Sequence, residues 1–125
     1  MKVVLDAGAL VAVDKRDRRV GAMLHVLQAQ GVAVHTSVAA VAQVWRNGRK
    51  QALLARVLAG VRIVGLLPGA ERSIGELLAK AGTTDVVDAH VALLVDHGDR
   101  LVTSDPTDLE RLLTARRTTA LIVPV

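Results

Sequence analysis

The stretch "RLVTSDPTDLERLLTA", residues 100–115, contains a complete strand, turn and helix. Its apolar start over 100–104 is typical of a short buried strand. Pro106 suits the first position of a helix over 106–115, because the N–H that proline lacks would have no helical partner there. Asp105 stands between the two elements. We therefore expect a strand that ends beside an acidic side chain and is followed at once by a helix.

The same alternation continues along the whole chain. Apolar runs predict further strands at 2–6, 32–36, 61–66 and 119–125, the last an edge strand because it contains Pro124. Helical spacing fills the intervals, at 7–13 (a helix or turn), 18–31, 38–46, 50–60, 69–82 and 83–98. Near-continuous apolar strands between helices favour an α/β fold with a parallel sheet covered on both faces. The length of 125 residues predicts a single domain, 1–125.

Two helix starts carry side chains that can cap them. Thr36 or Ser37 is expected to cap the helix over 38–46, and Thr84 the helix over 83–98.

Composition narrows the class of protein. Hydrophobic residues make up 51% of the chain, yet Trp45 is the only aromatic, so the core must be aliphatic. Cysteine is absent, which excludes disulfides and thiolate metal sites. The first residues, "MKVVLDAGAL", are too short and too charged for a membrane span. We expect a soluble, cytoplasmic protein without membrane association.

Charge is distributed unevenly along the chain, whose net charge is +4. No acidic residue lies between Asp17 and Glu71, an interval with seven basic residues: Arg18, Arg19, Arg46, Arg49, Lys50, Arg56 and Arg62. Nine of the 12 acids lie between Glu71 and Glu110. A basic surface beside an acidic cluster is typical of a protein that holds a polyanion near a cation. A solvated helix face explains the basic residues equally well.

Acidic residues also gather at predicted strand ends. Asp6 ends the first strand and Asp105 follows the fourth, while Asp85 and Asp88 share one face of the helix before the fourth strand. If the first and fourth strands are neighbours, these four carboxylates meet in one crevice. Each has an ordinary alternative as a helix cap or first-turn acid, and Asp88 is the hardest to explain that way. Clustered carboxylates need a cation, and oxygen ligands suit Mg²⁺ or Mn²⁺.

Other kinds of site find little support. The four histidines form no spacing typical of zinc, and the chain has no GxGxxG, GxxxxGK[ST] or GxSxG motif. Dinucleotide binding, P-loop hydrolysis and serine-hydrolase chemistry are therefore disfavoured.

Four segments in this order resemble the PIN domain family, and within it the VapC-type toxin ribonucleases of toxin–antitoxin pairs. They are "VVLDAGAL" (3–10), "TSVAAVAQVWR" (36–46), "DVVDAHVALL" (85–94) and "LVTSDPTDL" (101–109). The resemblance implies a three-layer α/β/α sandwich around a mostly parallel sheet of four to five strands. It also implies Mg²⁺- or Mn²⁺-dependent endoribonuclease activity, a homodimer, and a cognate VapB-like antitoxin as partner.

The resemblance also assigns residues. Asp6, Asp88 and Asp105 match the catalytic, metal-binding aspartates, and Thr103 and Ser104 would orient Asp105 or a bound water. The chain departs from the family at Gln43, where a glutamate is usual. Glutamine brings no charge, so the site is one negative charge poorer. Asp85, on the helical face of Asp88, is expected to restore that charge as a further metal ligand.

Basic residues near Gln43 would serve the RNA. Arg46, three residues further on, is expected to face the crevice and bind phosphate, with a surface ion pair or dimer contact as the alternative. Arg49 and Lys50 would steer phosphates without specific contacts. The sequence thus predicts RNA phosphodiester hydrolysis by a metal-activated water. Two alternatives stay open: a module that binds RNA or an antitoxin without cleavage, and a small-molecule phosphatase.

Overall fold

The computed structural model describes all residues from 1 to 125 and contains one five-stranded parallel sheet. The strands are β1 (Val3–Leu5), β2 (Val34–Ser37), β3 (Arg62–Val64), β4 (Arg100–Thr103) and β5 (Leu121–Pro124). Their order across the sheet is β3-β2-β1-β4-β5. Thus β1 pairs in parallel with β2 on one side and with β4 on the other. The edge position predicted for the strand containing Pro124 is confirmed.

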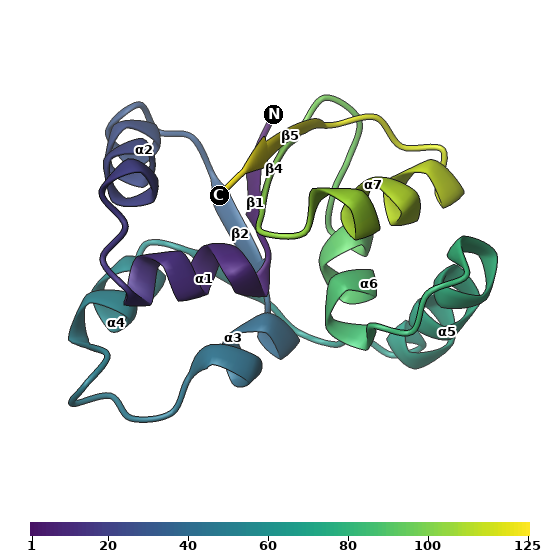
Figure 1. The fold of residues 1–125 in the computed structure, drawn as a ribbon, viewed down its shortest axis with the longest axis horizontal. Coiled ribbons are helices and arrows are strands. Elements are labelled where there is room, and N and C mark those ends of the chain that lie inside the picture. Colours follow the sequence, from purple (N-terminus) through teal and green to yellow (C-terminus); the bar gives the residue numbers. More distant parts are fainter.

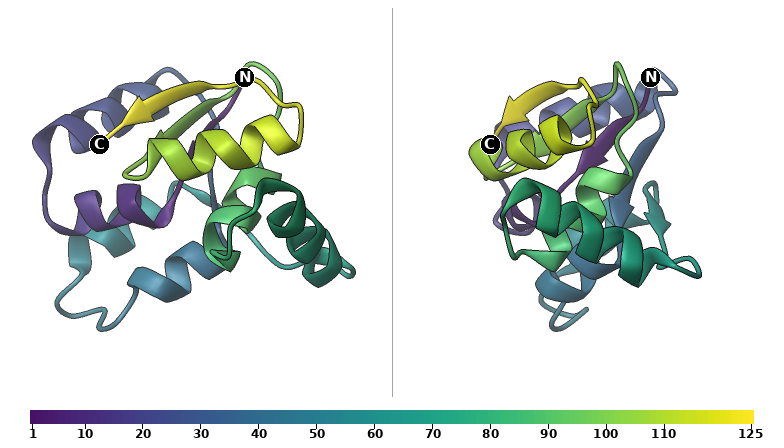
Figure 2. Two further views of the ribbon diagram at one scale, coloured as in Figure 1. Left: turned by 45° about the vertical axis from the view of Figure 1, so that its right-hand side comes forward. Right: turned by 90° about the vertical axis from the view of Figure 1, so that its right-hand side faces the viewer.

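Seven helices cover the sheet. They are α1 (Ala7–Asp14), α2 (Arg18–Ala29), α3 (Val38–Val44), α4 (Ala52–Leu58), α5 (Ala70–Ala81), α6 (Val86–Leu93) and α7 (Pro106–Ala115). Helices α1, α2 and α4 lie on one side of the sheet, and α5, α6 and α7 lie on the other (Figures 1 and 2). The predicted α/β sandwich with a parallel sheet is therefore confirmed. No helix is both long and apolar enough to span a lipid bilayer.

The core is aliphatic, as the composition requires. Val3, Val4 and Leu5 of the central strand are fully buried, because helices cover both faces of β1. Leu101 and Val102 of β4 are fully buried as well. A strand that is buried on both faces reads as a continuous apolar run, which is why such runs located these strands in the sequence.

Strand order places one crevice in the fold. From β1 the chain continues to β2 and β3 on one side, whereas β4 and β5 lie on the other. The order therefore reverses between β1 and β4, and ligands of open α/β sheets bind beyond the carboxyl ends of the strands at such a point. Asp6 and Ser104 directly follow these two strands. This end of the sheet is called the carboxyl edge below.

Helix boundaries differ from the sequence prediction mainly at α6. The helix spans Val86–Leu93 instead of 83–98, and its cap is Asp85 instead of Thr84. The Asp85 carboxylate accepts a hydrogen bond from the Asp88 N–H at 2.9 Å. The prediction for Thr84 was wrong because the helix begins one residue later than its apolar pattern indicates. By contrast, Ser37 caps α3 by accepting from the Ala39 and Ala40 N–H groups, as one of the two expected caps.

Candidate metal centre

Asp6 lies at the end of β1 and caps α1. Its side chain is buried, and its two carboxylate oxygens accept hydrogen bonds from the N–H groups of Ala9 at 2.8 Å and Ser104 at 3.3 Å. Burial raises the pKa of Asp6, although the Thr103 hydroxyl and these N–H groups favour the charged form. Asp6 therefore caps α1, as the alternative prediction had it. The cap also holds its carboxylate at the carboxyl edge, where the metal site was predicted.

The end of β4 is built around Thr103. Its buried Oγ1 accepts a hydrogen bond from the Asp105 N–H at 2.8 Å, so the hydroxyl contacts both Asp105 and Asp6. The Ser104 side chain is exposed, and only its N–H bonds to Asp6. The first turn of α1 approaches closely here, because a Cβ on Gly8 would lie 1.7 Å from the Ser104 Oγ. Glycine at position 8 therefore allows the two strand ends to meet.

Asp88 is the most perturbed acid in the structure. It is 8% exposed on α6 and lies in the first turn, three residues after the cap Asp85. Burial raises the pKa of Asp88 to about 7, and four other carboxylates add to the shift: Asp85, Asp6, Asp105 and Asp108. The other three predicted acids therefore all act on Asp88 at the carboxyl edge.

Asp108 is an acid that the sequence analysis did not place in the site. The N–H of Asp108 donates to the Asp105 carboxylate at 3.4 Å, just as the N–H of Asp88 donates to Asp85. A side-chain hydrogen bond with Asp105 and the charge of Asp105 raise the pKa of Asp108. The signal was present in the sequence, since "DVVD" and "DPTD" share the same spacing of a cap and a third-position acid.

Three of the carboxylates can share one cation. Single oxygens of Asp88, Asp105 and Asp108 all lie within 4.8 Å of one another. Both salt bridges of the structure involve Lys2 and acids at the other end of the sheet, so neither neutralises this group. Oxygen-only donors suit Mg²⁺ or Mn²⁺, and a divalent cation would remove the repulsion that raises the pKa of Asp88. The residues present therefore fit such an ion.

The predicted metal ligands divide into two groups. Asp88 and Asp105 belong to the three-carboxylate group, whereas Asp6 and Asp85 lie close enough to act on Asp88 but use carboxylate oxygens to cap α1 and α6. Gln43 is exposed on α3 and makes no side-chain hydrogen bond. Direct ligation by Asp6, Asp85 or Gln43 stays a prediction.

The basic residues lie in an exposed loop after α3. The Arg46 guanidinium donates to the carbonyl oxygens of Ala42 at 3.1 Å and Trp45 at 2.6 Å, so in this structure it covers the C-terminal end of α3. Arg49 and Lys50 are exposed. Their role as phosphate contacts stays a prediction.

Gln51 organises this basic loop and was not singled out in the sequence analysis. Its buried amide oxygen accepts from the Arg46 N–H at 2.7 Å and the Asn47 N–H at 2.9 Å. Its amide nitrogen donates to the Val44 carbonyl at 3.0 Å and the Asp14 carboxylate at 3.2 Å. The loop that carries the basic side chains is therefore fixed to α1 and α3.

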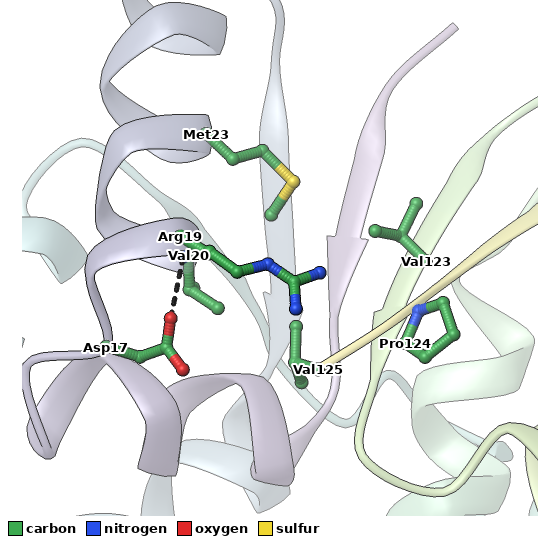
Figure 3. Close-up of a pocket in the computed structure, with 7 residues that line it drawn as sticks. All are labelled: Asp17, Arg19, Val20, Met23, Val123, Pro124 and Val125. Carbon is green, nitrogen blue, oxygen red and sulfur yellow. Dashed lines mark hydrogen bonds between the residues drawn. The ribbon is translucent and has the colours of Figure 1, made fainter.

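A separate hollow of about 320 Å³ lies between the start of α2 and β5. In Figure 3 the Arg19 side chain extends between Met23 and Val125, and the Asp17 carboxylate accepts from the Val20 N–H at 3.1 Å. None of the clustered carboxylates lines this hollow. Its one acid is a helix cap, so we place no metal chemistry there.

Comparison with known proteins shows the fold. One match is a chain in the structure of VapBC2 from Rickettsia felis bound to a DNA fragment from its promoter, at 17% identity and a TM-score of 0.71. It covers 98% of this chain and 99% of the other. A second is a chain of FitAcB from Neisseria gonorrhoeae, at 17% identity and a TM-score of 0.62, covering 95% and 96%. No family model and no curated protein matches the sequence.

These comparisons correct the family prediction. Both structures are complexes, and likeness at 17% identity shows a shared fold without showing which family the chain belongs to. With no matching family model, the identification of a PIN-domain toxin of the VapC type was wrong. The quoted segments are short, and each contains the start of a helix, where acids and hydroxyl side chains serve as ordinary caps. Local motifs of that sort were too weak to establish a family.

Proposed function

We propose that the protein is a divalent-metal-dependent endoribonuclease that works as one component of a toxin–antitoxin pair. The observation that carries the catalytic part is the group of unneutralised carboxylates, with Asp88 at its centre and its pKa raised to about 7. The structures that share the fold, VapBC2 and FitAcB, are toxin–antitoxin complexes, which supports the biological setting and a partner protein.

The chain's own residues would divide the work at the carboxyl edge. Asp88, Asp105 and Asp108 would hold Mg²⁺ or Mn²⁺, while Thr103 keeps Asp105 and Asp6 in place. The cation, when bound, supplies a Lewis acid that makes water a better nucleophile and stabilises charge on a phosphodiester. No side chain would form a covalent bond to the substrate.

RNA binding would use the basic loop that Gln51 fixes. Arg49 and Lys50 are exposed there without acidic partners, so they can contact phosphates. Such contacts release counterions, and RNA affinity should therefore fall steeply with salt. The Arg46 guanidinium would have to leave the carbonyl groups of α3 to reach a phosphate. The proposal includes a homodimer.

The test is cleavage of a mixed cellular RNA preparation by the purified protein, freed of any partner. We expect cleavage with Mg²⁺ or Mn²⁺, loss of cleavage with EDTA, and a loss of at least about 100-fold in Asp88→Asn. Asp99→Asn is the matched control, because Asp99 is equally buried but lies at the other end of β4.

Other outcomes would favour the alternatives. RNA binding without cleavage under every metal condition would replace the nuclease with a binding module. Hydrolysis of p-nitrophenyl phosphate with RNA left intact would instead indicate a phosphatase.

A further inference from the structure

A buried histidine with one free nitrogen lies on α6, on the helix that carries Asp88. His90 is 4% exposed, and its Nδ1 lies 2.5 Å from the Ser37 Oγ. The Ser37 oxygen already accepts hydrogen bonds from the N–H groups of Ala39 and Ala40, so its hydroxyl hydrogen is available for His90. In this arrangement Ser37 donates to Nδ1, and the neutral imidazole carries its proton on Nε2.

The Nε2–H of His90 has no partner within the protein. Only the Thr83 hydroxyl is a fully buried side-chain polar group without a hydrogen bond, so Nε2 still reaches open space. The His90 ring lines a hollow of about 360 Å³ between α6 and the segment that joins β3 to α5. Ser37 thus holds the ring by Nδ1 and leaves the Nε2–H of a residue that lines this hollow free to donate.

The first turn of α5 forms another wall of the hollow. Gly69 and Ala70 line it. Gly69, with φ of 87°, stands at the N-cap position before the 12-residue helix and supplies no side-chain cap. The Glu71 N–H donates to no carbonyl group. The N–H groups of Ala70, Arg72 and Ser73 donate to the Leu67 and Gly69 carbonyls, so the Glu71 N–H is the free donor of this turn. That N–H and the partial positive charge of a helix start favour a negatively charged acceptor.

The remaining walls of the hollow suit a small ligand that is apolar apart from one polar group. They are aliphatic for the most part, and neither Lys nor Arg nor any acid is among the lining residues: Val64, Gly65, Leu67, Pro68, Gly69, Ala70, Ser73, His90, Leu93 and Leu94. A multiply charged phosphate would lack a cationic partner here. A single carboxylate needs only the His90 N–H, the Ser73 hydroxyl and the helix start.

We propose that this hollow, distinct from the carboxyl edge, binds a small aliphatic carboxylate through the Nε2–H of His90 and the start of α5. The carboxylate could belong to a free branched acid or to the C-terminal leucine of a peptide. Both present the same chemistry: an aliphatic body of a few carbons that ends in one negative charge. The proposal is independent of nuclease activity.

The test is calorimetric titration of the whole protein with 4-methylpentanoate and with acetyl-Gly-Leu. We expect at least one to bind, and the amide of the same compound to bind about tenfold more weakly because it lacks the charge. Binding of the free acid alone identifies a small-molecule site, and binding of the peptide alone identifies a site for chain termini. Failure of both probes to bind would overturn the proposal.

Two variants locate the site. His90→Phe keeps a ring but removes the donor, and it should weaken binding about tenfold. Gly65 lines the hollow, and a Cβ there meets no atom within 4 Å, so Gly65→Leu adds a bulky side chain to its wall and leaves every donor in place. It should abolish binding in a folded protein.

Gly75→Leu is the matched control for the filled hollow. Gly75 is also exposed on α5 with open space around its Cβ, and it lines a neighbouring hollow that does not include His90. Binding that survives Gly65→Leu would contradict the site even if His90→Phe failed to fold.

Discussion

The two ends of strands β1 and β4 treat their acidic residues in opposite ways. At the amino ends, the Lys2 ammonium contacts the Asp96 carboxylate at 2.7 Å and the Asp99 carboxylate at 2.5 Å. The hydrogen bonds and charge of Lys2 lower the pKa of Asp99 against the effect of its burial. At the carboxyl ends no cation pairs with the cluster, and the pKa of Asp88 rises to about 7.

The contrast separates a structural acid from a functional one. Asp99 and Asp88 are both nearly buried, at 3% and 8% exposure. Only Asp99 has a basic partner in the chain, so its charge supports the fold, whereas the charge of Asp88 opposes it. An ionisable group with an unfavourable charge in a crevice is a candidate for a functional site, and the geometry here supports a bound cation.

Removing each charge should therefore change stability with opposite sign. Asp99→Asn should lower the free energy of unfolding by about 3 kcal/mol, because it leaves the Lys2 ammonium without its buried partner. Asp88→Asn should raise it by about 2 kcal/mol at pH 8 without metal, because it relieves desolvation and repulsion. Urea denaturation of the metal-free proteins measures both. A lower free energy of unfolding in Asp88→Asn would show that the charge of Asp88 supports the fold, as the charge of Asp99 does.

The dependence on pH should also have opposite sign at the two ends. The folded-state pKa of Asp88 is raised, so its contribution to stability is present below pH about 3.8 and is lost as pH rises through about 7. The pKa of Asp99 is lowered, so its contribution is present above 3.8 and is lost as pH falls through its folded-state value.

Unfolding experiments can isolate the Asp88 part of this dependence. Between pH 5 and 8 the metal-free protein should lose about 2 kcal/mol relative to Asp88→Asn. Saturating Mn²⁺ should remove most of this loss, because a cation favours the charged carboxylate. Parallel stability profiles for the two proteins would show that Asp88 titrates as an ordinary acid.

A substitution at Gly8 tests whether the metal centre depends on close packing at the carboxyl edge. Gly8→Ala would place a methyl group 1.7 Å from the Ser104 Oγ and 2.4 Å from its Cβ. The strand ends must then separate, and we expect a loss of about 1–2 kcal/mol together with weaker Mn²⁺ binding. Gly21→Ala is the control, because a Cβ there meets nothing within 4 Å and should stabilise α2 by about 0.5–1 kcal/mol. Unchanged Mn²⁺ affinity in Gly8→Ala would show that the site tolerates this separation.

The smallest expected effect concerns a charge at the margin of the site. Asp85→Asn keeps a side chain that can cap α6 but removes a negative charge that acts on Asp88. The Mn²⁺ affinity should fall about threefold by calorimetry, since Asp85 is exposed and its charge is screened. Asp17→Asn, the equivalent change at the cap of α2, should have no effect. Equal affinity in both variants would exclude Asp85 from the metal centre.

Sequence patterns predicted most of the fold because buried parallel strands leave a direct trace. Strands such as β1 and β4 are apolar on both faces, and Gly82 ends α5 where the pattern predicted, with φ of 70°. The first residue of a helix was harder to predict, because Thr84 and Asp85 are both good caps and only the backbone conformation decides between them. The sequence could not predict that β1 and β4 are neighbours, because no local pattern encodes which strands pair.

The site was predicted in part for related reasons. Acids that interrupt an apolar run, such as Asp88, are conspicuous in a sequence. Asp108 follows Pro106 in a polar helix start, so its sequence neighbours do not set it apart. The side chains of Gln43 and Arg46 could not be oriented from spacing, since α3 ends at Val44 before Arg46. Family membership failed for a different reason: motifs of a few residues cannot replace similarity along the whole chain.

The central claim is that the carboxyl edge holds a divalent cation. The acids at the amino ends of β1 and β4 need none, because Lys2 pairs with them. Calorimetric titration of the metal-free protein with Mn²⁺ at pH 8 tests it most directly, with Asp88→Asn and Asp99→Asn measured alongside. We predict binding to the unmodified protein, unchanged affinity in Asp99→Asn, and at least about tenfold weaker binding in Asp88→Asn. No binding to the unmodified protein, or equal affinity in all three, would contradict the claim.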